Sequence, residues 1–312
     1  MTIQRHDLSN DDWRVGILPA TGASIAFGRV QKSGAWVDVL RPTAEADYGN
    51  SSNSASFIML PWANRIRDGV LRLGDQSWQL ATTKDDGTAR HGASRHFAWN
   101  VVSADDLHIH MSFDSADYPN VNFPLHFTAS AEYRLEGLDF IWRLSITNAD
   151  AQAFPCGFGH HPYFVRNRAH EPEILIPCDL EYRMEKAMPS DPPVPVSPRL
   201  DFRQWRALDN NILDDLLTGR QRNTAVGLRF PDTGVELSMH ADDIFKHVIA
   251  FAPDHPDLPA YFALEPQTNA NDGFNLHARG IDTAGVIVLQ PGATAAGDVV
   301  LRIETSSVEK KE

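Results

Sequence analysis

The chain has 312 residues, of which 42% are hydrophobic and 22% are charged. This composition is ordinary for a globular protein and excludes intrinsic disorder for the bulk of the chain. The 28 Lys and Arg against 41 Asp and Glu give a formal net charge of -13, which argues against binding to nucleic acid or to an anionic membrane surface.

The sequence carries no sign of export or membrane insertion. Its two cysteines, Cys156 and Cys178, are too few for a disulfide framework. The polar first ten residues contain no apolar signal segment, and no run reaches the roughly 18–20 apolar residues of a membrane helix. We therefore expect a cytoplasmic protein.

Alternation of apolar and polar residues is the dominant pattern and predicts antiparallel strands. It is clearest in residues 127–135 and 138–146, which are joined by the turn residues Glu136 and Gly137 and are therefore predicted to form a β-hairpin. The other predicted strands and hairpins are, in chain order, 70–80, 107–113, 228–237, 285–289 and 299–303.

Helical periodicity is weak, and we predict only short helical turns at 202–208 and 210–217. The segment 188–198 is rich in proline and is predicted to be a stiff, extended loop within the domain. Strands this close together, without crossover helices, predict an all-β antiparallel sandwich. We expect one domain over 1–303, with few short helices, and a polar tail at 304–312.

Two adjacent histidines stand in an unusual context. His160 and His161 lie in the segment 154–164, where glycines, prolines and aromatic residues surround them. Gly157 and Gly159 allow unusual backbone angles, which would aim a side chain into an aromatic-lined pocket. A structural turn with an imidazole hydrogen-bonded in the core is the alternative.

The histidines elsewhere are expected to be ordinary surface or strand residues. His108 and His110 share one face of a predicted strand, as two metal ligands would. No third ligand lies at metal spacing nearby, so we expect a solvated strand face and no metal site.

Glu265 ends an apolar strand immediately before Pro266, so we expect its carboxylate to be partly buried. Burial raises the pKa of a carboxyl group and makes it a better base near neutral pH. A strand-end Glu paired with a surface Arg is the alternative. Four amides follow and suit either hydroxyl recognition or turn formation: Gln267, Asn269, Asn271 and Asn275.

Taken together, these segments resemble the aldose 1-epimerase (galactose mutarotase-like) family. The resemblance covers about residues 10–303 and implies that family's large antiparallel β-supersandwich fold. The matching motifs occur in the family's order and are PWANRI at 61–66, HG at 91–92, GFGHHPYF at 157–164, LDDLLTG at 213–219 and LEPQTNANDGFN at 264–275.

The resemblance also implies roles for single residues. His161 matches the family's catalytic histidine, a general acid, and Glu265 matches its catalytic base. Asp214 matches an aspartate that binds sugar hydroxyls, with Asp215 as the competing assignment. The expected substrate-binding residues are Arg65, His91, Asp214, Asn64 and His160, the last as a supporting residue.

The reaction that this implies is interconversion of the α and β anomers of an aldose. It needs an acid and a base but no redox step, so we expect no cofactor and no metal. We expect His161 and Glu265 to face each other across a gap that fits one pyranose. The expected partner is a small-molecule aldose, with the protein a monomer or homodimer.

Three alternatives stay open at this point. A hexose-6-phosphate 1-epimerase would need cations for the phosphate, for which the candidates are Arg67, Arg72, Arg90 and Arg95. A non-catalytic carbohydrate-binding protein could use the same scaffold. A glycoside hydrolase needs two opposed carboxylates, for which Asp214 and Glu265 are candidates.

Overall fold

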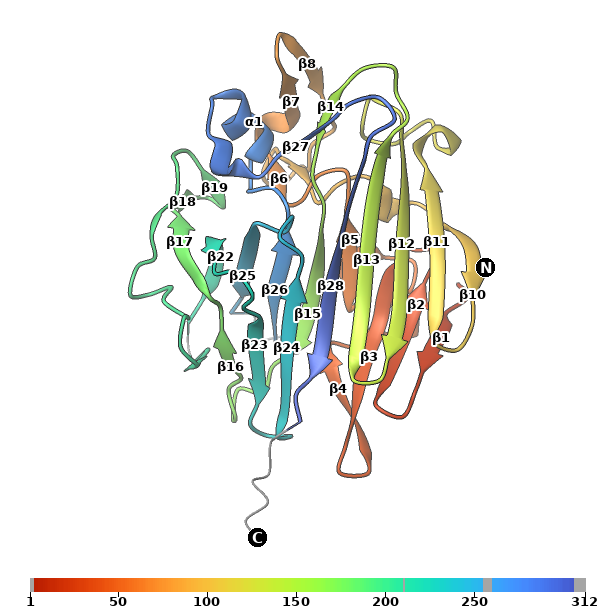
Figure 1. Ribbon diagram of the computed structural model, residues 1–312, viewed down its shortest axis with the longest axis vertical. Helices are drawn as coiled ribbons and strands as arrows, with labels where there is room; N and C mark the ends of the chain where they lie inside the picture. The colour runs from red at the N-terminus through yellow and green to blue at the C-terminus, as the bar shows by residue number, and fades with distance from the viewer. Residues whose placement is uncertain (1–2, 210, 255–259, 306–312) are drawn as a thin grey trace.

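The computed structural model describes residues 3–209, 211–254 and 260–305. Two large antiparallel sheets make up most of it and face each other across the hydrophobic core (Figure 1). The expected all-β sandwich with few short helices is therefore confirmed. Most of the expected tail, residues 306–312, lies outside the described residues, as does Asn210.

The first large sheet has 11 strands and carries His161, Glu265 and Asp214. Its strands, in spatial order, are β1 (His6–Ser9), β2 (Trp13–Leu18), β3 (Ser24–Lys32), β4 (Ala35–Leu40), β15 (Gly159–Val165), β26 (Tyr261–Gln267), β25 (His247–Ala252), β22 (Leu213–Arg220), β17 (Cys178–Tyr182) and β20 (Val194–Pro195), with β5 (Ser56–Met59) paired to β15 and β3.

The second large sheet has 9 strands and covers the other side of the core. Its strands, in spatial order, are β10 (Asn100–Ala104), β11 (His108–Asp114), β12 (Phe127–Glu136), β13 (Asp139–Asn148), β28 (Thr294–Ile303), β24 (Val235–Ala241), β23 (Val226–Phe230), β16 (Glu173–Leu175) and β21 (Arg206–Ala207).

Four two-stranded ribbons and short helices complete the described part of the chain. The ribbons are β6 (Arg65–Ile66) with β9 (Ala89–Arg90), β7 (Val70–Leu73) with β8 (Gln76–Gln79), β14 (Phe154–Cys156) with β27 (Ile287–Leu289), and β18 (Met184–Glu185) with β19 (Met188–Pro189). The helices are α1 (Gly273–Ala278) and the 3₁₀ turns Glu45–Asp47, Ser51–Asn53, Arg67–Gly69, Ser94–His96, Ser115–Asp117 and Asp282–Ala284.

The period-two pattern of the sequence becomes alternating burial in the sheets. Every second residue of β12 is buried, and β12 pairs with β13 along its whole length through the turn at Gly137, whose φ is +55°. The buried faces of the two sheets meet in the core, where Trp13 of β2 lies 5.7 Å from Phe140 of β13 between ring centroids. The burial of apolar side chains between the two sheets is the main force that holds them together.

The predicted helical turns at 202–208 and 210–217 are wrong. Residues Arg206–Ala207 form β21, and Leu213–Arg220 form β22. β22 lies between β25 and β17 and forms ladder pairs on both sides. Those hydrogen bonds outweigh the tendency of adjacent aspartates to cap a helix, because strand formation depends on tertiary neighbours.

The sheet topology adds the pairing of the last two predicted strands and the place of the proline-rich segment. β27 pairs with β14, while β28 lies between β13 and β24, so these last two strands do not form a hairpin with each other. The proline-rich segment 188–198 is extended as predicted and contributes β19 and β20. β20 lies at the edge of the first sheet, where proline is tolerated because no further strand needs its missing N–H.

No helix in the described residues has the length and apolar character required to cross a membrane.

Candidate active site

His161 and Glu265 lie on adjacent strands and touch. The pairs Gly159–Gln267 and Tyr163–Ala263 bracket them in the register of β15 and β26. His161 Nε2 lies 3.1 Å from Glu265 Oε1, and the two side chains are 6% and 2% exposed. The sheet itself therefore holds an imidazole and a carboxyl group in direct contact in a buried place.

This contact corrects one expectation. The sequence predicts a gap between His161 and Glu265 that fits one pyranose. The distance of 3.1 Å between His161 Nε2 and Glu265 Oε1 leaves no such gap. The physical reason is that the hydroxyl oxygen and the ring oxygen of an aldose are both bonded to C1. Two groups that reach these oxygens can therefore be neighbours on one side of the sugar.

Gly157 and Gly159 allow this close approach through their small size and not through the unusual backbone angles that were predicted. Neither Gly157 nor Gly159 has a positive φ. A Cβ on Gly159 would lie 2.6 Å from the carbonyl oxygen of Pro266, and one on Gly157 would lie 1.9 Å from Asn269 Oδ1. They are needed for close approach between segments, because a larger residue would push β15 away from β26.

Burial drives both members of the pair toward their neutral forms. Burial and the charge of Arg95 lower the pKa of His161 well below its usual value. Burial and the charge of Asp214 raise the pKa of Glu265 well above its usual value. An imidazole with a carboxylic acid holds one proton, and so does an imidazolium with a carboxylate. The pair therefore keeps one proton, whose position depends on the surroundings.

Aromatic side chains surround His161 on its side of the sheet. The ring centroids of Phe57 and Tyr163 lie 4.6 Å and 4.4 Å from that of His161. The ring of His91 stands nearly perpendicular at 5.3 Å. Arg95 lies over Phe57 at 4.5 Å from the ring centroid. These groups form an aromatic wall with Arg95 beside it, the mostly apolar lining with few polar groups that small-molecule sites commonly have.

Arg65 and His91 come from the β6–β9 region beside this wall. Asn64 and His91 both have a positive φ, of +57° and +60°, and the His91 amide donates to the Asn64 carbonyl at 2.6 Å. Left-handed backbone is uncommon outside glycine and is found disproportionately at functional sites. Burial and the neighbouring His161 lower the pKa of His91 well below its usual value.

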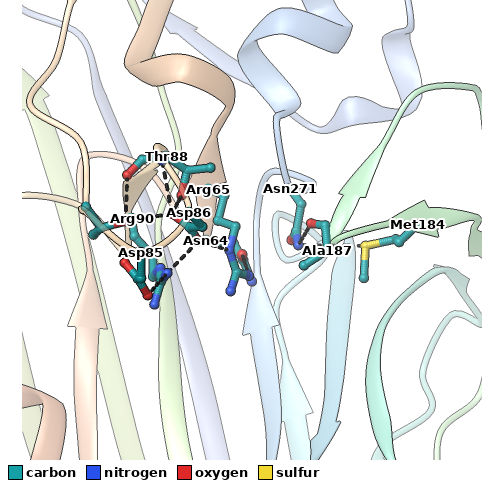
Figure 2. A network of polar contacts seen from close by, with 10 residues as sticks. Asn64, Arg65, Asp85, Asp86, Thr88, Arg90, Met184, Ala187 and Asn271 are labelled. Atoms are coloured by element: carbon teal, nitrogen blue, oxygen red, sulfur yellow. Dashed lines mark hydrogen bonds and ion pairs between the residues drawn. The ribbon is translucent and has the colours of Figure 1, made fainter.

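The side chain of Arg65 is held at two nitrogens (Figure 2). Nε donates to Asp86 Oδ2 at 3.2 Å, and NH1 donates to Asn64 Oδ1 at 3.1 Å. Its charge lowers the pKa of both His161 and Glu265. Arg65 is therefore close enough to the pair to influence its proton.

Asp214 and Asp215 are adjacent on β22 but have different surroundings. Asp215 forms an ion pair with Arg199. Asp214 is exposed at the surface and acts instead on Glu265, whose pKa its charge raises. Adjacent strand residues point to opposite faces of a sheet, so the geometry directs Asp214, and not Asp215, toward the pair.

His160 is the predicted site residue that the structure does not bring to the others. It is fully buried, it pairs with Ile58 of β5, and its ring lies 5.0 Å from that of Trp142 in the second sheet. It therefore points into the core, on the face of β15 opposite to His161. We leave it out of the candidate substrate-binding set for that reason.

The amides after Glu265 mostly fix the backbone. Asn269 Oδ1 accepts from the Ala63 amide at 3.0 Å, and its Nδ2 donates to the Ala63 carbonyl at 3.1 Å. Asn271 Nδ2 donates to the Ala187 carbonyl at 2.8 Å (Figure 2). The sequence left hydroxyl recognition and turn formation open for these residues. For Asn269 and Asn271, the contacts are those of residues that hold the backbone in place.

Sequence reasoning missed Asp86, which contacts Arg65, and the loop that carries it. The only sequence signal was a turn-type Asp-Asp-Gly run at residues 85–87 with threonines on both sides. A cavity of about 660 Å³ opens beside this loop, across from the β18–β19 ribbon. Its lining includes Asp86, Thr88, Arg67 and Lys186.

The described residues contain no cluster of three or more His, Cys, Asp or Glu side chains that could hold a metal ion. His108 lies half-exposed on β11, with Nε2 3.7 Å from Glu132 Oε2. Its surroundings are those of a strand face open to solvent.

Comparison of the sequence with known proteins gives a family match and a curated relative. The sequence model described as aldose 1-epimerase matches residues 5–302. The uncharacterized protein YphB of Escherichia coli K12 is 24% identical over 282 residues, which cover 87% of this chain and 91% of that protein.

Solved structures share the fold at low sequence identity. A galactose mutarotase-like protein from Clostridium acetobutylicum superposes with a TM-score of 0.84 at 17% identity, covering 96% of this chain and 94% of that one. A galactose 1-epimerase from Lactobacillus acidophilus gives a TM-score of 0.77 at 18% identity, covering 96% of this chain and 94% of that one.

Proposed function

We propose, from the premise that this chain belongs to the aldose 1-epimerase family, that it interconverts the α and β anomers of an aldose by opening and closing the sugar ring. The observation that carries the proposal is the buried contact of His161 Nε2 with Glu265 Oε1 at 3.1 Å. It supplies a proton donor and a proton acceptor at one place, which is what ring opening requires.

In the proposed mechanism, two protons move while no electron or group is transferred. Glu265, as carboxylate, accepts the proton of the C1 hydroxyl. His161, as imidazolium, donates a proton to the ring oxygen, and the C1–O5 bond breaks. The aldehyde rotates about C1–C2, and the ring closes on the other face with the two roles reversed.

Burial of the pair favours this step. Ring opening starts from the pair with its one proton on His161, an imidazolium and a carboxylate, which burial makes the less populated form, and it ends with an imidazole and a carboxylic acid. The low-dielectric surroundings that lower the pKa of His161 and raise that of Glu265 favour the second state. The same surroundings therefore stabilise the protein in the form that it has when the sugar is open.

The remaining members of the site would bind and orient the sugar. In this proposal Arg65, held by Asn64, and the ring of His91 contact the oxygens near C1. In this proposal Asp214 accepts hydrogen bonds from sugar hydroxyls. Fixed donors and acceptors of this kind lower the barrier because they need no rearrangement as charge develops.

The phosphorylated-sugar alternative has weaker support. All four arginines that were candidates for binding a phosphate already have polar partners, Arg95 through a hydrogen bond of 3.2 Å from NH1 to Ser52 Oγ. Arg67 binds Asp272, Arg72 binds Asn275, and Arg90 binds the loop carboxylates. A phosphate would have to displace these contacts, so an unphosphorylated aldose is our first choice.

Polarimetry on a panel of freshly dissolved sugars tests the proposal. D-Glucose, D-galactose, D-xylose and D-glucose 6-phosphate would be compared, with protein-free solutions as blanks. We expect acceleration of at least one neutral aldose. A large preference for the phosphate would favour the hexose-6-phosphate alternative. Calorimetric sugar binding without acceleration of any sugar would favour the non-catalytic alternative and contradict the proposal.

A further inference from the structure

The Asp86 carboxylate is the centre of a polar network beside Arg65 (Figure 2). Its Oδ1 accepts hydrogen bonds from the Thr83 hydroxyl at 2.6 Å and from the amide and hydroxyl of Thr88 at 3.0 Å and 2.7 Å. Its Oδ2 accepts from Arg65 Nε at 3.2 Å and from Arg90 NH2. One oxygen is thus fixed to the loop, and the other bridges two arginines.

The two arginines need such a bridge. In the β6–β9 ribbon Arg65 is paired directly with Arg90, and like charges opposite each other on adjacent strands repel. Burial alone would raise the pKa of Asp86, but the hydrogen bonds from Thr83 and Thr88 hold it below its usual range. The bridging oxygen therefore carries negative charge between the two cations.

The bridge also determines where Arg65 points. A guanidinium group is planar and rigid, so fixing two of its nitrogens fixes the direction of the third. Asp86 holds Nε and Asn64 holds NH1. Among the described residues NH2 of Arg65 has no hydrogen-bond partner, and it stays available to a ligand.

We propose that Asp86 is a positioning residue, which aims the Arg65 guanidinium at the sugar through its Oδ2 atom. The inference rests on the proposed function only in taking Arg65 as a sugar-binding group. Asp86 acts through Arg65 and need not touch the sugar. Loss of this bridge would leave Arg65 free to turn away from the sugar under repulsion from Arg90.

The geometry of Asp86 supplies a variant that separates positioning from folding. In Asp86→Asn the amide oxygen can keep the Oδ1 bonds to Thr83 and Thr88, while the NH2 group replaces Oδ2 and faces two guanidinium groups. The loop keeps its anchor and the arginine bridge is lost. Asp85→Asn is the matched control, because Asp85 is 68% exposed and contacts Arg90 without reaching Arg65.

The experiment measures kcat and KM of mutarotation for the wild type, Asp86→Asn, Asp85→Asn, Arg65→Ala and the Arg65→Ala/Asp86→Asn double variant. We expect Asp86→Asn to raise KM at least about tenfold, the effect of losing one charge-assisted hydrogen bond, with a smaller change in kcat. Asp85→Asn should stay within about twofold of the wild type. In the Arg65→Ala background, Asp86→Asn should have no further effect.

Two results would overturn the inference: equal effects of the Asp85 and Asp86 variants, or a full Asp86→Asn effect in the Arg65→Ala background. Absence of mutarotase activity in the wild type would contradict the proposed function without deciding the inference about Asp86. In that case calorimetric affinities of the same five proteins for D-galactose and D-glucose decide the inference by the same comparison.

Discussion

His161 and Glu265 share one proton, and the charges around them decide which residue holds it. Asp214 contributes a negative charge that raises the pKa of Glu265. Arg65 contributes a positive charge that lowers it. Because the two groups are coupled, activity should follow the single-proton state of the pair, with a bell-shaped dependence of rate on pH.

Asp214→Asn should move the alkaline limb of that profile to lower pH. The pKa of Glu265 is raised and that of His161 is lowered, so the last proton of the pair lies on Glu265 and its loss ends activity. Without the Asp214 charge, the Glu265 carboxylate forms more readily. The measurement is the pH dependence of kcat/KM for mutarotation.

Asp215→Asn is the control for this prediction. Asp215 is paired with Arg199 and points to the other face of β22, so its removal should leave the alkaline limb in place. A shift of the limb to higher pH in Asp214→Asn, or the same shift in both variants, would show that Asp214 does not act on the pair as we describe.

At the scale of the elements, one buried amide joins two segments that carry site residues. Asn269, after β26, binds both the amide and the carbonyl of Ala63, next to Asn64. It is 2% exposed, so its loss leaves buried backbone groups without partners. Each such group costs about 1–3 kcal/mol.

Asn269→Ala should therefore lower the free energy of unfolding by about 2–6 kcal/mol, measured by urea denaturation. Asn122 offers a matched control because it binds the amide and carbonyl of Ala81 in the same two-bond manner, at 2.7 Å and 3.0 Å, in a solvent-accessible place. Asn122→Ala should cost under about 1 kcal/mol, since water replaces the lost bonds. Equal losses would mean that burial is not what makes the Asn269 bridge important.

Some strands could be predicted from the sequence and others could not. The hairpin of β12 and β13 was predictable, because its alternation is local and its turn contains a glycine. β22 was not, because its partners β17 and β25 are distant in sequence. A strand that depends on such neighbours has no unambiguous local signal.

The candidate site divides in the same way. His161 and Glu265 stand out through the motifs around them, yet their direct contact follows from the β15–β26 register, which the sequence does not reveal. The position of His160 inside the core depends on which face of β15 is covered. Asp86 acts through a loop whose partners Arg65 and Arg90 meet only in the β6–β9 ribbon.

At the scale of the whole molecule, the core contains buried histidines that should lower the stability of the fold in acid. His160 and His247 are fully buried, and burial lowers the pKa of each to about 3. In the unfolded chain a histidine takes up a proton near pH 6.5. The unfolded state therefore binds more protons than the folded state between about pH 6.5 and pH 3, and stability falls as the pH falls through this range.

His160→Phe should weaken this acid sensitivity. Each buried histidine contributes a slope of about 1.4 kcal/mol per pH unit well below pH 6.5, so the variant should lose about that much of the slope. The measurement is the urea unfolding free energy at several pH values from 7 to 4. His110→Asn, at a half-exposed position on β11, is the control. An unchanged slope in His160→Phe would contradict the assignment of a buried neutral imidazole.

The most direct test of the account is the rate of anomer exchange in variants of the His161–Glu265 pair, followed by polarimetry or by NMR exchange between the two anomer signals. His161→Ala and Glu265→Gln should each lower kcat by at least about 10²-fold with folding intact. His160→Phe, adjacent in sequence but facing the core, should keep most of the activity. Rates close to the wild type in either pair variant would contradict acid–base catalysis by these two residues.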